Sequence, residues 1–150
     1  MTDQSRRLSL AAQAAKALGH PARLRLLAML RQGPLCVCQM TAVLELAPST
    51  VSGHLLELRR ADLVAEQKRG KWVEYRLRVD GPLARLVRQT LALVADDPTA
   101  IADLKRVRAI VAVPVEIFCQ TGFDLAKARA RVATAPRRRT RRSSTRSVQT

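Results

Sequence analysis

A change of hydrophobic period within the first half of the chain sets the order of the elements that it can form. Apolar residues over residues 21–60 recur every three or four positions, as in helices, whereas residues 72–77 alternate between two faces, as in a strand. Gly33-Pro34 and Pro48 divide the helical part into three short helices, and only a few residues separate the last two. This spacing is typical of a helix-turn-helix, and Arg69-Gly70-Lys71 predicts a hairpin turn directly after it. We therefore expect a mainly α fold with a β-hairpin wing, the winged helix-turn-helix.

The charge of the chain points to a polyanionic partner. The formal net charge is +15, and because six arginines lie in the last fourteen residues, residues 1–135 alone still carry +9. Such a positive field attracts polyanions, so nucleic acid is the first candidate partner and an acidic membrane surface is the second. No apolar run approaches the roughly 20 residues that span a bilayer, and the amino terminus lacks the pattern of a signal peptide. We expect a cytoplasmic protein without a membrane partner, whose three cysteines stay reduced.

The helix that begins near Pro48 is the expected DNA-reading helix. A helix-turn-helix lays its second helix in the major groove while basic groups on flanking elements hold phosphates. Polar surface residues are often only solvated, but the wing and the residual charge favour contact with DNA. The candidate residues on the reading helix are Ser49, Thr50, Ser52, His54 and Arg59, and those at the wing turn are Lys68, Arg69 and Lys71.

The segment KALGHPARLRLLAMLRQGPLCVCQMTAVLELAPSTVSGHLLELRRADLV, followed by KRGKWVEYRL, resembles the arsenic-repressor (ArsR/SmtB) family of dimeric winged-helix metal sensors. The resemblance covers about residues 8–95. It implies a homodimer built from the helix expected over residues 6–20 and the helix from Leu83, bound to double-stranded operator DNA when free of inducer and released by the inducer. The family often shows Ser-Arg-His in the reading helix, whereas this chain has Ser52-Gly53-His54, so an arginine expected to contact DNA is missing.

Three parts of the chain follow from these patterns. We expect a DNA-binding and dimerisation domain over residues 1–95 and a carboxyl-terminal extension over residues 96–135. The extension shows a helical pattern to about Val111, a break at Pro114 and a last helix from about Phe123. The arginine-rich tail, residues 136–150, has too little apolar content to fold and is expected to be disordered.

Two of the three cysteines lie one residue apart, near the start of the helix expected between Gly33-Pro34 and Pro48. Residues two apart on a regular helix point about 200° from each other, so Cys36 and Cys38 cannot share one core face. They can approach one ion only if the helix begins at or after them, or is distorted there. A helix start also lowers the pKa of a thiol and favours the thiolate that binds soft metals.

The resemblance extends to the cysteine motif. Arsenic-responsive members read Leu-Cys-Val-Cys-Asp-Leu-Cys, and the matching residues 35–41 place Thr41 where the third cysteine would be. Trivalent arsenic and antimony take three sulfurs, and Cys119 is the one further cysteine of the chain. The predicted site is therefore Cys36, Cys38 and Cys119, with As(III) or Sb(III) as inducer ligand and no organic cofactor. The predicted function is a repressor of a metalloid-resistance operon.

Other functions stay open at this point. Zinc prefers four ligands in a tetrahedron and fits worse, but cadmium or lead also accept thiolates. A redox switch is a further alternative, because Cys119 could pair with either of the other cysteines, and all three could be only structural. An architectural DNA-binding protein would respond to no thiophilic ion. An enzyme, such as a thiol oxidoreductase or an arsenate reductase, is disfavoured, because no nucleophile lies beside a base and no glycine-rich phosphate loop is present.

Overall fold

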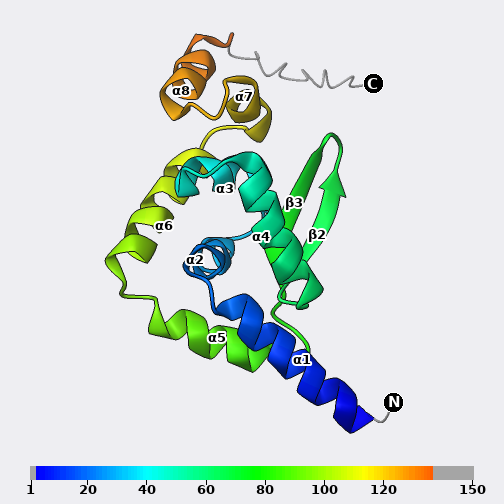
Figure 1. Ribbon diagram of the computed structural model, residues 1–150. Helices are drawn as coiled ribbons and strands as arrows, with labels where there is room; N and C mark the ends of the chain where they lie inside the picture. The colour runs from blue at the N-terminus through cyan, green and yellow to red at the C-terminus, as the bar shows by residue number, and fades with distance from the viewer. Residues whose placement is uncertain (1–2, 137–150) are drawn as a thin grey trace, which may run out of the picture.

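The computed structural model describes residues 3–136, which form eight helices and a small sheet (Figure 1). Their order is α1 (Asp3–Leu18), α2 (Pro21–Leu30), β1 (Leu35–Cys36), α3 (Val37–Leu44), α4 (Pro48–Arg60), β2 (Val64–Arg69), β3 (Trp72–Leu77), α5 (Ala84–Leu93), α6 (Pro98–Val111), α7 (Val115–Gln120) and α8 (Leu125–Thr134). The winged helix-turn-helix predicted from the sequence is confirmed. Within this described part, none of the helices is both long and apolar enough to cross a membrane. The predicted tail lies outside it, except for its first residue.

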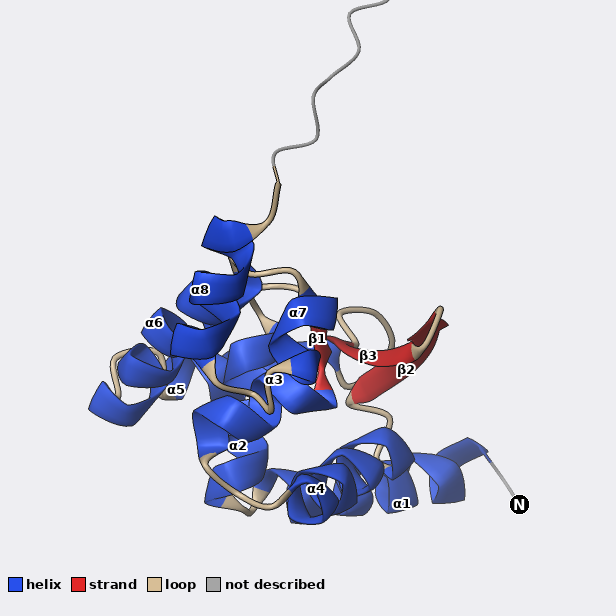
Figure 2. Ribbon diagram, turned by 90° about the horizontal axis from the view of Figure 1, so that it is seen from above, coloured by secondary structure: helices blue, strands red, loops and turns tan. Residues whose placement is uncertain are grey.

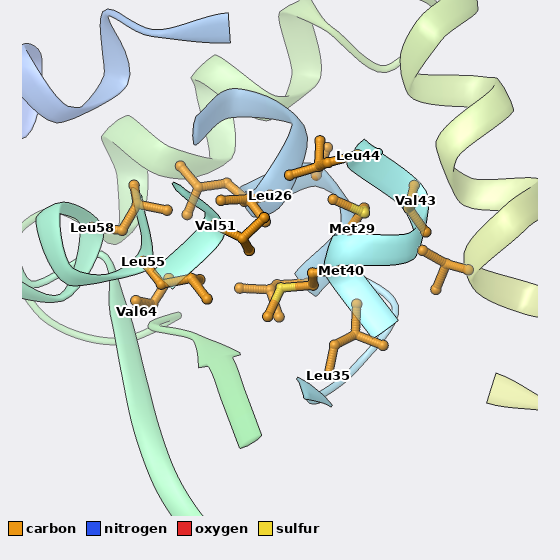
Figure 3. Close-up of a cluster of buried hydrophobic side chains, with 14 of the residues drawn as sticks. Leu26, Met29, Leu35, Met40, Val43, Leu44, Val51, Leu55, Leu58 and Val64 are labelled. Carbon is orange, nitrogen blue, oxygen red and sulfur yellow. The ribbon is translucent and has the colours of Figure 1, made fainter. Parts of the chain in front are cut away.

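The helix-turn-helix consists of α3 and α4. Glu45 ends α3 in the left-handed conformation, with φ of 55°, and its N–H donates to the carbonyl of Thr41. Leu46 and Ala47 then lead to Pro48, which occupies the first turn of α4, where a missing N–H costs no hydrogen bond. The predicted apolar stripe of α4, Val51, Leu55 and Leu58, is fully buried. Figure 3 shows these side chains meeting others from α2 and α3, so the reading helix is fixed to the core along one face.

The sheet contains the predicted hairpin and one strand that the sequence did not predict. β2 and β3 pair antiparallel from Val64 opposite Leu77 to Arg69 opposite Trp72, and Gly70 takes a φ of 57° in the turn. β1 adds to the other edge of β3, with Cys36 opposite Glu74, so that the strand order is β1-β3-β2. β3 is thus the central strand, and it connects the wing to the residues that precede α3.

The carboxyl-terminal extension packs against the helix-turn-helix. α6 contacts both α2 and α3, and α7 contacts α3, as the view from above also shows (Figure 2). Asp103 of α6 is 3% exposed and accepts two hydrogen bonds from the guanidinium of Arg25 in α2, at 2.7 and 2.8 Å. Arg106 donates to the carbonyl of Val43 at 3.2 Å. α6 is therefore joined to both helices through buried apolar contacts and specific polar ones.

The end of the extension differs in part from the sequence prediction. The break at Pro114 is present, but a short additional helix, α7, follows it, and the last helix begins two residues after the expected Phe123. Phe118 of α7 is fully buried and belongs to the same hydrophobic core as the residues of α3 and α4. This burial holds α7, and with it Cys119, close to the start of the helix-turn-helix.

Candidate DNA-binding surface and thiol site

The outer face of α4 carries small polar side chains. Ser49, Thr50 and Ser52 are exposed, and His54 is half-buried. A β-carbon added at Gly53 would have no atom within 4 Å, so this position leaves open space where the family has its arginine. A surface of short side chains lets a helix backbone approach a groove closely, because few long side chains hold the two surfaces apart. The geometry suits a reading helix.

Two lysines of the wing are unpaired. Lys68 and Lys71 are exposed next to the hairpin turn, and neither takes part in an ion pair within residues 3–136. Arg69, between them, lies 3.4 Å from a carboxylate oxygen of Glu74. At the wing turn, the two lysine ammonium groups are therefore more available to an external phosphate than the guanidinium of Arg69.

Arg59 is connected to the wing. Its guanidinium donates to Oε1 of Glu66 in β2, and the hydroxyl of Tyr75 in β3 donates to Oε2 of the same carboxylate at 3.1 Å. Burial, followed by this hydrogen bond, raises the pKa of Tyr75 above its ordinary value. The reading helix and both wing strands thus share one polar cluster. A role of Arg59 in DNA contact stays a prediction, and its side chain is already engaged by Glu66.

His54 has a neighbour that the sequence did not reveal. Its ring lies 4.4 Å from that of His20, centroid to centroid, and His20 Nδ1 accepts a hydrogen bond from the N–H of Ala22 at the start of α2. Burial, then the charges of His20 and Arg23, lower the pKa of His54. Near neutral pH the reading helix therefore presents a neutral imidazole at this position.

All three cysteines lie near the start of α3, but in different states. α3 begins at Val37, between Cys36 and Cys38, so only Cys38 lies within the helix. Cys38 forms a disulfide bond with Cys119 of α7, across 81 residues of sequence and with 6.2 Å between the two Cα atoms. Cys36 is a free thiol and is 4% exposed. The structure therefore brings together two of the three predicted sulfur ligands and leaves the third unbonded in the preceding strand.

Cys36 corrects the expectation about thiol acidity. Its N–H donates to Oε1 of Gln39 at 2.9 Å, which fixes the residue at the start of α3. Burial, and then the negative charges of Glu74 and Glu116, raise the pKa of the Cys36 thiol to about 11. Desolvation and nearby carboxylates therefore outweigh the helix start, and the thiol is protonated at neutral pH.

Thr41, which stands where the family motif has its third cysteine, is also buried. It is 6% exposed, and its hydroxyl oxygen has no hydrogen-bond partner within the described residues. Thr41 follows Cys38 by three positions, so both lie on the same side of α3. With Cys38 and Cys119 bonded to each other, residues 3–136 hold no group of three or more His, Cys, Asp or Glu side chains that could bind a metal ion.

Comparisons with known proteins identify the family of the segment that contains the helix-turn-helix. Residues 20–66, from the start of α2 into β2, match the bacterial regulatory proteins of the arsR family. The uncharacterized HTH-type transcriptional regulator MJ1325 of Methanocaldococcus jannaschii is 39% identical over 66 residues, which make up 43% of this chain and 74% of that protein. The chain belongs to the arsR family of bacterial regulatory proteins. The arsenic resistance transcriptional regulator ArsR1 of Pseudomonas putida is 41% identical over 68 residues, or 45% of this chain, and the match spans about half of that relative, 53%.

A solved structure supports the same assignment. HlyU from Vibrio cholerae aligns over 64% of this arsR-family chain and 100% of its own, with 30% identity and a TM-score of 0.54. The curated relatives are transcriptional regulators rather than enzymes, as the sequence led us to expect. The match to the arsR family ends in β2, so the contact of Cys38 with α7 lies partly beyond it.

Proposed function

We propose that this arsR-family protein is a transcriptional repressor that binds operator DNA as a homodimer and is released when trivalent arsenic or antimony binds Cys36, Cys38 and Cys119. The contact between Cys38 and Cys119 carries the proposal, because it puts sulfur atoms from α3 and α7 within bonding distance. Cys36 is two residues from Cys38 and is held at the same helix start. The similarity to ArsR1, named for arsenic resistance, supports the choice of ligand.

The homodimer and the DNA contacts are part of the same proposal. α1 and α5 each expose large apolar side chains, Leu8 at 77% and Leu93 at 86%, which a second copy would cover. Ser49, Thr50, Ser52 and His54 would approach the bases, and Lys68, Arg69 and Lys71 would hold phosphates, with Arg59 adding its free N–H groups. Two copies would present two reading helices to a two-fold symmetric operator.

Metalloid binding requires the disulfide to be reduced first, by a thiol reductant that supplies two electrons and two protons and is itself oxidised to a disulfide. Arsenous acid then exchanges its hydroxyl groups for thiols, and each As–S bond that forms releases one water made from a hydroxyl and a thiol proton. Closing a three-sulfur site draws Cys36 out of its place beside Gln39, which reorients the start of α3. Since α3 supports α4 through the core, the reading helix changes its position. A preference of about 1–3 kcal/mol for the conformation that binds DNA weakly is enough for a useful switch.

A thiol-redox repressor is the second candidate, and the observed disulfide favours it. Here Cys38 and Cys119 each lose a proton and together two electrons to a peroxide, which leaves as water while the S–S bond forms. This switch needs no third sulfur. The two candidate functions therefore differ in whether they require Cys36, because metalloid binding uses this residue and disulfide formation does not.

The experiment follows from this difference. Reduced wild-type protein and its Cys36→Ser and Cys119→Ser variants are bound to a fluorescent DNA fragment selected by the wild-type protein from a random pool. Each complex is titrated with arsenite, antimonite, cadmium, zinc and peroxide, and release is followed by anisotropy. For metalloid sensing we expect arsenite to release the wild type and neither variant. Release of Cys119→Ser at the wild-type arsenite concentration would exclude the three-sulfur site.

In the same experiment, peroxide distinguishes a thiol-redox repressor from a metalloid-responsive one. If the disulfide is the physiological signal, peroxide releases wild type and Cys36→Ser alike and leaves Cys119→Ser bound, while arsenite releases none of them. If no ion and no oxidant releases the wild type, both candidates fail and an architectural DNA-binding role gains support. Gel filtration of the same samples at micromolar concentration tests the homodimer.

A further inference from the structure

A pocket of about 520 Å³ lies on a part of the molecule that neither the reading helix nor the cysteines use. Its wall is formed by the end of α2, by β3 and the residues after it, and by α5. Leu30, Leu77 and Leu91 supply apolar surface. Its volume lies within the range of about 300–1,000 Å³ that is usual for small-molecule sites.

Three arginines from three different elements line this pocket. Arg31 follows α2, Arg76 belongs to β3, and Arg88 belongs to α5. None of them takes part in an ion pair within residues 3–136, and no Asp or Glu lines the pocket. Three like charges that share one concave surface repel one another, and an anion placed between them removes that repulsion.

We propose that this pocket binds a small organic anion with an apolar body, such as an aromatic carboxylate or phosphate. Guanidinium groups bind carboxylate and phosphate through paired N–H donors, which fixes the orientation of the anionic group. The leucines provide a surface on which the rest of the ligand removes apolar area from water. Neither an inorganic ion nor a neutral apolar molecule satisfies both parts of this wall.

The site is compatible with a homodimer that uses the outer face of α5. At about 100° per residue, Arg88 lies roughly 160° around the helix from Leu86 and roughly 140° from Leu93. These two leucines are the exposed large apolar residues of α5, at 38% and 86%. Covering them with a second copy therefore leaves the pocket side of α5 accessible.

DNA phosphate is the other anion that these arginines could meet, and their position argues against it. Arg76 pairs with Ala65 near the base of the wing, whereas Lys68 and Lys71 lie next to the turn at its tip. Arg88 and Arg31 belong to neither α4 nor the hairpin. The pocket arginines thus lie apart from the candidate DNA-binding residues along the wing.

The test measures binding of defined probes to the full-length reduced protein by isothermal titration calorimetry. Benzoate and phenyl phosphate are compared with benzyl alcohol, benzylamine and inorganic phosphate at constant ionic strength. We expect saturable binding of the two aromatic anions, weakened at least about tenfold in an Arg31→Gln, Arg76→Gln, Arg88→Gln triple variant. A matched variant, Lys105→Gln, Arg108→Gln, Arg129→Gln, loses the same charge from α6 and α8, away from the pocket, and keeps wild-type affinity.

Several results overturn the proposal. One is the absence of saturable binding of either aromatic anion to the wild type. Equal weakening in both triple variants would show a general charge effect, and equal affinity for inorganic phosphate would show a surface that recognises charge alone. A loss of DNA affinity in the pocket variant without any binding of benzoate would assign the arginines to DNA. The Arg88→Gln single variant replaces the triple variant if the latter unfolds at a lower temperature than the wild type.

Discussion

Asp103 of α6 and Arg25 of α2 form a two-point ion pair, in which the carboxylate side chain is 4% exposed and the guanidinium side chain 30% exposed. Because the pair joins the carboxyl-terminal extension to the helix that supports the helix-turn-helix, it makes these parts a single packed unit. Removing one partner leaves the other without its counter-charge, which is far more costly than removing an exposed pair.

Replacing Asp103 with Asn should therefore lower the free energy of unfolding by about 2–3 kcal/mol, less than for a fully buried pair because water can still reach Arg25. Urea unfolding under reducing conditions measures the change. Glu57→Gln is the matched control, because its pair with Arg60 is exposed and its loss should cost less than about 0.5 kcal/mol. Equal effects of the two substitutions would contradict the structural role of Asp103.

Thr41 offers a gain-of-function test of the metalloid proposal. In a Cys119→Ser background that no longer responds to arsenite, Thr41→Cys should restore release, because it supplies a third sulfur on the same side of α3 as Cys38. Thr41→Ser in the same background keeps a hydroxyl and should not restore it. Restoration by both substitutions, or by neither, would argue against a three-sulfur trigger at the start of α3.

The pair of histidines predicts a pH dependence of stability. The pKa of His54 is lowered in the folded protein, so the unfolded chain binds the proton more readily as the pH falls through about 6.5. Stability should therefore decrease from pH 7.5 to pH 5.5, and part of this decrease should be absent in His54→Gln. His20→Gln should reduce it as well, because it removes one of the charges that disfavour the His54 cation. The urea unfolding midpoints of the wild type and both variants are measured at the two pH values. If both variants keep the pH dependence of the wild type, the histidine pair does not cause it.

The wing lysines predict a change in the salt dependence of DNA binding. The double substitution Lys68→Gln, Lys71→Gln should reduce the slope of log affinity against log salt by nearly 2 for each wing that contacts DNA, and so by nearly 4 for the proposed homodimer, at about 0.9 per phosphate contact. The loss should be similar for all DNA sequences, since phosphate contacts carry no sequence information. Lys105→Gln, Lys127→Gln removes the same charge from the extension and should leave the slope unchanged. A smaller slope in the control would show that DNA also contacts the extension.

The sequence predicted the helix-turn-helix and the hairpin because each has a hydrophobic period long enough to recognise. β1 has only two residues, and it exists as a strand through pairing with Tyr75 and Glu74, about forty residues later. α7 has six residues, too few to show a helical period, and Phe118 fixes it by burial in a core formed by distant elements. Such elements depend on tertiary contacts that no local pattern contains.

The cysteines of the proposed thiol site could be chosen from the sequence, but their arrangement could not. Cys119 was predicted as the third sulfur because the chain has three cysteines, and this role stays a prediction, whereas its bond to Cys38 depends on how α6 and α7 pack. The acidity of Cys36 could not be predicted, since its pKa is raised by burial and then by the charges of Glu74 and Glu116, which come from β3 and α7. The missing arginine at Gly53 was visible in the sequence, whereas the ion pair of Arg59 with Glu66 required the register of the wing.

The place of β3 in the middle of the sheet gives the wing a mechanical property. The hairpin shares its backbone hydrogen bonds with the strand that holds Cys36, and that strand leads without a break into α3. If the proposed inducer site forms, we therefore expect backbone movement of Cys36 to shift the wing and the start of α3 at the same time. Release from DNA would then occur in one step, without a state in which the wing alone has separated from the DNA.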